Sequence, residues 1–134
     1  MSDIEKMLVE YFADRAEVIA VYLFGSYAKG KQRDMSDIDI GILLDENDPE
    51  MFRRRRMDYV SGLGRLTRKD VDVVILNSAG EELLKQVLLK GKCILVRDVK
   101  KLARAKIVMM SRIAEFGYYK SRMHSGLTKR IMGA

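Results

Sequence analysis

The chain has 134 residues, of which 48% are hydrophobic, and it contains 25 Lys and Arg residues against 19 Asp and Glu, which gives a net charge of +6. This composition predicts one folded domain rather than a disordered chain, and no stretch approaches the roughly 20 consecutive apolar residues of a membrane span. The only cysteine, Cys93, excludes an internal disulfide and favours a reducing cytoplasmic location. It lies in an apolar run, so we expect a buried structural thiol.

Helical and extended patterns alternate along the chain and predict an α/β fold with a mixed sheet of about four strands. Ser2 and Glu5 have the spacing of a capping box at the start of a helix, and so do Ser78 and Glu81. In chain order we expect a helix over 3–16, a strand over 18–24, a polar loop over 30–36, a strand over 37–44, a helix over 49–61, a strand over 71–76, a helix that ends at Gly91, a strand over 93–96 and a helical tail from 99.

The tail has more apolar surface than one small sheet can cover, so we expect it to serve partly as core and partly as a partner or dimer interface. It forms one long helix or two helices joined near Gly117. Its two apolar rows are Leu102, Met109, Ile113 and Phe116, and Ile107, Met110, Ala114 and Tyr118. The whole chain, 1–134, is then a single domain with a core over about 1–98 and a helical tail over about 99–134.

Two aspartates that alternate along the second predicted strand are candidate metal ligands. Asp37 and Asp39 are two residues apart, so their side chains share one face of the strand, about 7 Å apart. Two carboxylates so placed repel each other, and a divalent cation between them removes the conflict. Oxygen ligands favour Mg²⁺, with Mn²⁺ as the alternative, over zinc.

A third carboxylate is expected from the next strand. Asp72 stands within the apolar run from Val71 to Leu76, and it completes the set if the two strands are neighbours. Asp70 would share its face and is the competing candidate, but the tighter apolar flanks favour Asp72.

A phosphate-binding pattern precedes the aspartates. Gly25 lets a triphosphate lie against its backbone, and Ser26 can donate its hydroxyl and N–H to phosphate oxygens. Lys29, Lys31 and Arg33 follow in the same turn and could neutralise the phosphates. Together with Asp37, Asp39 and Asp72, they predict a site for a nucleoside triphosphate and two Mg²⁺ ions.

The segment G-S-Y-A-K-G…S-D-I-D-I resembles the minimal nucleotidyltransferases of the polymerase-beta-like superfamily, over roughly residues 18–96. Within it the chain looks most like the antitoxin of a HEPN–MNT toxin–antitoxin pair. The resemblance implies the superfamily's fold, with Gly25 and Ser26 as triphosphate binders and Asp37, Asp39 and Asp72 as metal ligands. It also implies ATP as substrate and transfer of AMP to a tyrosine of a HEPN-type ribonuclease toxin.

Larger relatives add a second domain that binds the acceptor, and this chain has only about 35 residues after its last predicted strand. The acceptor would therefore come from a partner protein, or the chain would self-associate. Two alternatives stay open: a nucleotidyltransferase with a small-molecule acceptor, and a non-catalytic module that neutralises its partner sterically. Four consecutive arginines, 53–56, are spread around a helix and are expected to be a solvated surface rather than a nucleic-acid site, and an acidic partner stays open as an alternative.

Overall fold

The computed structural model describes residues 2–27 and 37–131, with the side chains of residue 119 and of 124–131 left undescribed. Its elements are α1 (Asp3–Ala13), β1 (Val18–Phe24), β2 (Ile38–Leu44), α2 (Pro49–Thr67), β3 (Val71–Ile75), the 3₁₀ turn η1 (Leu76–Ser78), α3 (Glu81–Lys90), β4 (Lys92–Val96) and α4 (Val99–Ile131). Each expected helix and strand is present, and α2 runs six residues past the predicted end.

The four strands form one mixed sheet in the order β3-β2-β1-β4. β1 is antiparallel to both β2 and β4, whereas β2 and β3 are parallel. A parallel pair needs a crossover connection, and α2 supplies it. The predicted α/β class and mixed sheet are thereby confirmed.

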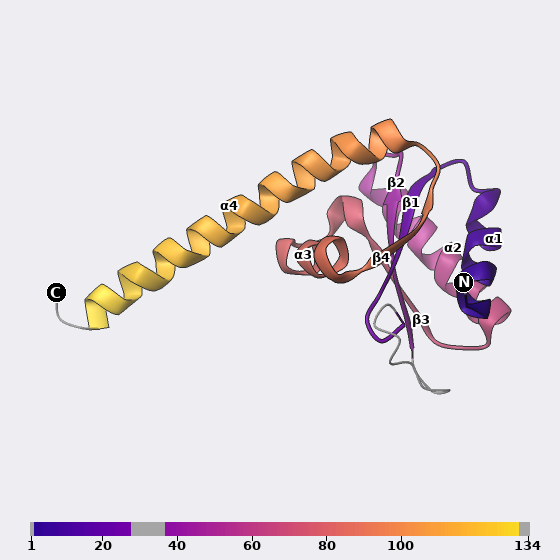
Figure 1. Cartoon of the computed structure of the whole chain (residues 1–134), viewed down its shortest axis with the longest axis horizontal. Helices are drawn as coiled ribbons and strands as arrows, with labels where there is room; N and C mark the ends of the chain where they lie inside the picture. Colours follow the sequence, from indigo (N-terminus) through magenta and orange to yellow (C-terminus); the bar gives the residue numbers. More distant parts are fainter. Residues whose placement is uncertain (1, 28–36, 132–134) are drawn as a thin grey trace.

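Helices cover both faces of the sheet (Figure 1). On one face, Phe12 of α1 and Tyr59 of α2 are buried with ring centroids 5.1 Å apart in an edge-to-face arrangement. On the other face, Val87 of α3 and Met109 of α4 pack against β1 and β2. The two central strands, β1 and β2, are almost wholly buried because both faces of the sheet are covered in this way.

The tail is one helix, α4, of 33 residues, so the first of the two alternatives is confirmed and the chain is not broken near Gly117. Leu102 and Met109 are buried on the domain, and Lys120 pairs with Glu82 of α3 at 3.1 Å. Figure 1 shows the distal part of α4 running clear of the sheet. Among the described residues no helix is both long and apolar enough to cross a membrane.

Three local predictions are corrected. The Ser2 hydroxyl accepts from the Glu5 N–H at 3.2 Å, but the Glu5 carboxylate binds Lys92 at 3.0 Å instead of closing the capping box. The second capping box was wrong, because α3 is capped by Gly80 without a side-chain hydrogen bond and Ser78 lies in η1. Cys93 is exposed, because it lies on β4, an edge strand with little cover.

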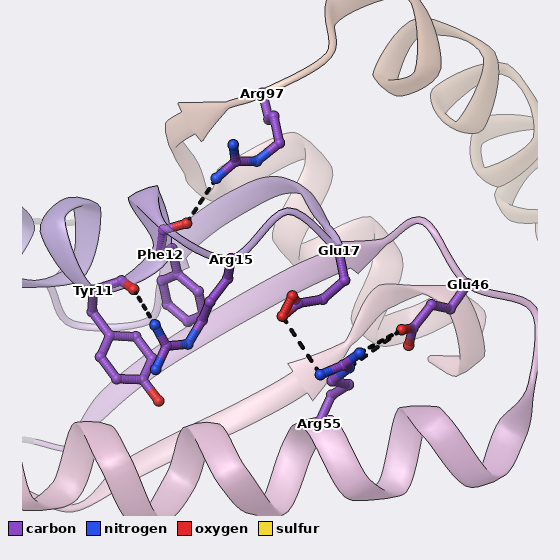
Figure 2. Close-up of polar contacts among 7 residues, drawn as sticks. All are labelled: Tyr11, Phe12, Arg15, Glu17, Glu46, Arg55 and Arg97. Carbon is purple, nitrogen blue, oxygen red and sulfur yellow. Dashed lines mark hydrogen bonds and ion pairs between the residues drawn. The ribbon is translucent and has the colours of Figure 1, made fainter.

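Arg55 contradicts the expectation that the four arginines are only a solvated surface. Its guanidinium lies between two carboxylates, 2.9 Å from Glu46 Oε1 and 3.7 Å from Glu17 Oε1 (Figure 2). Glu17 precedes β1 and Glu46 follows β2, so this ion pair network fixes α2 against both strands. A second guanidinium in Figure 2, that of Arg97, donates to the Phe12 carbonyl at 3.0 Å and ties β4 to α1.

Candidate active site

Sheet register brings the aspartates of two strands together. Asp39 lies on the central strand β2, opposite Asp72 of β3 on one side and opposite Phe24, the last residue of β1, on the other. The residues on either side of Asp72, like those on either side of Asp39, face the core beneath α2. Because side chains alternate along a strand, the Asp72 and Asp39 side chains both lie on the opposite face of the sheet. The condition for a shared site, that β2 and β3 are neighbours, is met.

Gly25 lies directly against the Asp39 carboxylate. Its φ is +70°, in the left-handed region that favours glycine, and a Cβ placed there would collide with Asp39 Oδ2 and lie 3.1 Å from its Cγ. Only glycine lets the backbone turn this close to the carboxylate. The turn after β1 and the aspartate of β2 therefore form one structural unit.

The carboxylate of Asp39 is electrostatically unfavourable in the protein alone. Burial raises its pKa, and the negative charges of Asp72 and Asp37 raise it further. A bound divalent cation would oppose this shift by stabilising the ionised carboxylate, and a set of carboxylate oxygens is the donor set that Mg²⁺ prefers. The residues present therefore fit such an ion.

Asp37 and Asp72 are more accessible than Asp39. Asp37 precedes β2, which begins at Ile38 rather than at the predicted residue 37, and its side chain is exposed. The Asp72 side chain is 60% exposed. Within residues 2–27 and 37–131, no three Asp, Glu, His or Cys side chains are close enough together to hold a metal ion as they stand. The site therefore consists of Asp39 and Asp72, which are register partners, with Asp37 as a nearby third carboxylate.

The structure favours Asp72 over Asp70 as the third carboxylate. Asp70 lies before β3, and its carbonyl accepts the N–H of Ile38 at 2.9 Å, which makes it part of the strand pairing. Asp72 has Asp39 as its direct register partner and contributes to the raised pKa of that carboxyl. This geometry favours Asp72 as the third carboxylate.

Of the expected phosphate binders, Gly25 and Ser26 lie in the turn that ends β1, both half-buried. Lys29, Lys31 and Arg33 lie outside the described residues. The described part of the phosphate side thus consists of the backbone and hydroxyl of this turn.

Arg56 was missed by the sequence analysis, which treated it as surface. Its Nε donates to the Val73 carbonyl at 2.8 Å, and its Nη2 lies 3.9 Å from Asp72 Oδ1. A signal was present: Arg56 is four residues after Phe52 and three before Tyr59, both of which contact the core, so it occupies the core-facing row of α2.

Comparisons with known proteins agree with this fold. The family model described as "Polymerase beta, Nucleotidyltransferase" matches residues 6–100. The chain is 39% identical over 72 residues to the protein adenylyltransferase MntA of Shewanella oneidensis, covering 54% of this chain and 50% of that protein. It thus spans about half the length of this relative. It is also 32% identical over 81 residues, 58% of this chain and 80% of the relative, to a provisionally named protein adenylyltransferase of Methanocaldococcus jannaschii.

Solved structures show the same fold. A chain of a toxin–antitoxin complex crystallised with AMP-PNP superimposes with a TM-score of 0.72 at 24% identity, over 95% of this chain and 98% of that one. A chain from the complex of a tri-AMPylated Shewanella oneidensis HEPN toxin with its MNT antitoxin gives a TM-score of 0.67 at 22% identity, over 96% of each chain. With the family model matching residues 6–100, the chain belongs to the polymerase beta nucleotidyltransferase family.

Proposed function

We propose that this protein is a nucleotidyltransferase that transfers AMP from ATP to a tyrosine hydroxyl of a HEPN-type toxin and acts as its antitoxin. The observation that carries the proposal is the row formed by Gly25, in the turn directly after β1, Asp39 of β2 and Asp72 of β3. In this row the turn that we propose to bind phosphate lies beside one carboxylate, and a second carboxylate lies on the far side. The adenylyltransferase relatives and the AMPylated toxin in a structural neighbour support the choice of AMP and of a protein acceptor.

Each residue has a distinct role in this reaction. Asp39 would bind the metal, with Asp37 and Asp72 beside it, and the turn at Gly25 and Ser26 would hold the β- and γ-phosphates. Two bound Mg²⁺ ions would lower the pKa of the attacking hydroxyl and stabilise the leaving group. Asp72, which is exposed, is best placed to meet the acceptor.

The transfer forms one bond and breaks one. The acceptor oxygen attacks the α-phosphorus of ATP, the bond from that phosphorus to the bridging oxygen of the β-phosphate breaks, and pyrophosphate leaves. Asp72 would accept the proton of the hydroxyl. The product is a phosphodiester between AMP and the acceptor side chain.

The partner surface that we propose is the outer face of α4. Ile107, Met110 and Tyr118 are exposed there, 43% or more. Residues 99–134 contain nine Lys and Arg residues and one Glu, so they carry +8, whereas the rest of the chain has 16 basic and 18 acidic residues. Two such helices would repel each other, so an acidic partner protein fits this face better than a second copy.

Transfer of label from ATP carrying a labelled α-phosphate to a HEPN-type protein tests the proposal, and the product of the adjacent gene is the first candidate to assay. We expect Mg²⁺-dependent label on the partner with the wild-type protein. Asp39→Asn should lower transfer by at least about 100-fold, since even residues that only support a metal ligand cost 10- to 100-fold. The matched control is Asp58→Asn, an exposed aspartate on α2, which should leave transfer unchanged.

Two results would contradict the proposal. A partner that binds the protein but remains unlabelled would contradict AMPylation of a protein acceptor. A small-molecule acceptor would then be the next candidate. A protein that neutralises the toxin yet shows no calorimetric binding of ATP with Mg²⁺ would instead be a steric inhibitor.

A further inference from the structure

A groove of about 420 Å³ runs along the outer edge of β3, directly beside Asp72. Its walls come from α2 on one side and from β3 and the segment after it on the other. Its lining includes Phe52, Arg53, Arg56, Asp72, Val74 and Ser78. Of these residues only Asp72 also belongs to the proposed nucleotide and metal site.

Sheet order gives this groove a place in the reaction. Gly25 directly after β1, Asp39 of β2 and Asp72 of β3 follow one another across the sheet, and β3 is an edge strand. If pyrophosphate leaves on the Gly25 side, an in-line attack on the α-phosphorus requires the acceptor oxygen to enter from the opposite side. That side is the edge of β3, where the groove opens.

The chemistry of the groove suits a tyrosine on an acidic segment. Phe52 and Val74 give it apolar walls against which an aromatic ring can pack. Arg53 and Arg56 lie at its border, with side chains 73% and 52% exposed, so both guanidinium groups can also meet acidic residues that flank the tyrosine.

Arg56 also decides how a partner segment can enter. The edge of β3 would otherwise offer free backbone groups for an added strand, but the Val73 carbonyl is taken by Arg56 Nε at 2.8 Å. A side chain inserted into the groove is therefore compatible with the structure as it stands, whereas an added strand would displace Arg56. The same contact holds Nη2 beside Asp72 Oδ1 at 3.9 Å.

We infer that this groove is the acceptor site, which takes the side chain of a tyrosine flanked by acidic residues on the partner protein, and that Arg56 is a positioning residue for Asp72. The inference rests on the proposed function. The acceptor site would then lie on the catalytic domain itself. The described residues contain no second domain that could bind the acceptor.

Steady-state transfer of AMP to the HEPN-type partner, with ATP and partner varied separately, tests the groove. Ser78→Trp adds a large side chain at an exposed position in the groove lining and leaves Asp72 itself unchanged, and Arg56→Ala removes the positioning contact. We expect each variant to lower kcat/KM for the partner by about 10- to 100-fold, as a displaced acceptor does, with the KM for ATP unchanged. Arg54→Ala, an exposed arginine of the same helix outside the groove, is the matched control.

The outcomes distinguish a failure of the proposed function from a failure of the acceptor groove. A wild-type protein that labels no partner overturns the proposed function and the role of the groove together. A labelled partner whose kcat/KM is unaffected by Ser78→Trp overturns the groove alone. Equal losses for ATP and partner, or label that accumulates on a second copy of this chain, would also overturn it.

Discussion

Replacing Gly25 with alanine tests the junction between the turn proposed to bind phosphate and Asp39, the aspartate proposed to bind metal. The φ of +70° imposes a backbone strain of about 1–2 kcal/mol on any residue with a Cβ. For a domain of this size that corresponds to a fall in Tm of roughly 3–10 °C. The added Cβ also collides with the Asp39 carboxylate, which must move out of position. We therefore expect both lower stability and loss of ATP binding.

The two contributions can be separated in a double-mutant cycle. In an Asp39→Ala background the obstructing carboxylate is gone, so Gly25→Ala should cost only the backbone strain, and the two changes should not be additive. Urea unfolding measures stability, and calorimetry with ATP and Mg²⁺ measures binding. Gly117→Ala is the control: its Cβ meets nothing within 4 Å, and it lies inside α4, so it should raise stability by about 0.5–1 kcal/mol with ATP binding unchanged. Additive effects, or wild-type ATP affinity in Gly25→Ala, would refute the reasoning.

Three further predictions follow from the site and its support. The raised pKa of Asp39 means that its ionised form destabilises the metal-free protein, so Asp39→Asn should be more stable than wild type at neutral pH. That difference should shrink as the pH falls through the raised pKa, and a constant difference in urea unfolding would contradict it. Arg55→Ala should destabilise the protein by about 1.5–3 kcal/mol, because it leaves half-buried Glu17 and Glu46 without their cation, whereas exposed Arg54→Ala should stay within about 0.5 kcal/mol. Met110→Glu on α4 should weaken partner binding in calorimetry while leaving the Tm and ATP affinity unchanged, and an unaltered Kd would remove α4 from the interface.

The fold could be predicted from the sequence because its strands are short, strongly apolar and separated by clear turn residues. The pairing of the two strands that carry the aspartates could not be predicted. The sequence places Asp39 and Asp72 on separate strands, and only the register of the sheet shows that they are neighbours. The collision between Gly25 and Asp39 likewise depends on the turn after β1, which composition cannot give.

The sequence was less informative where two opposing tendencies had to be weighed. Cys93 lies in an apolar run, yet β4 is an edge strand, and exposure there depends on what covers the edge. The run of arginines looked uniform, but tertiary contacts give Arg55 two carboxylate partners and turn Arg56 towards β3. Ser78 had capping-box spacing, but the chain uses it in η1 instead.

The most direct test of the account is whether a metal ion binds between Asp39 and Asp72. Crystals of the protein with Mn²⁺ and α,β-methylene ATP, whose α–β bond cannot be cleaved, can be measured at the manganese edge for anomalous scattering. We predict an anomalous peak bound by the Asp39 carboxylate, with the β- and γ-phosphates against Gly25 and the α-phosphorus facing the Asp72 side. Manganese and nucleotide bound away from Asp39, or a triphosphate lying along the β3 groove, would contradict the account.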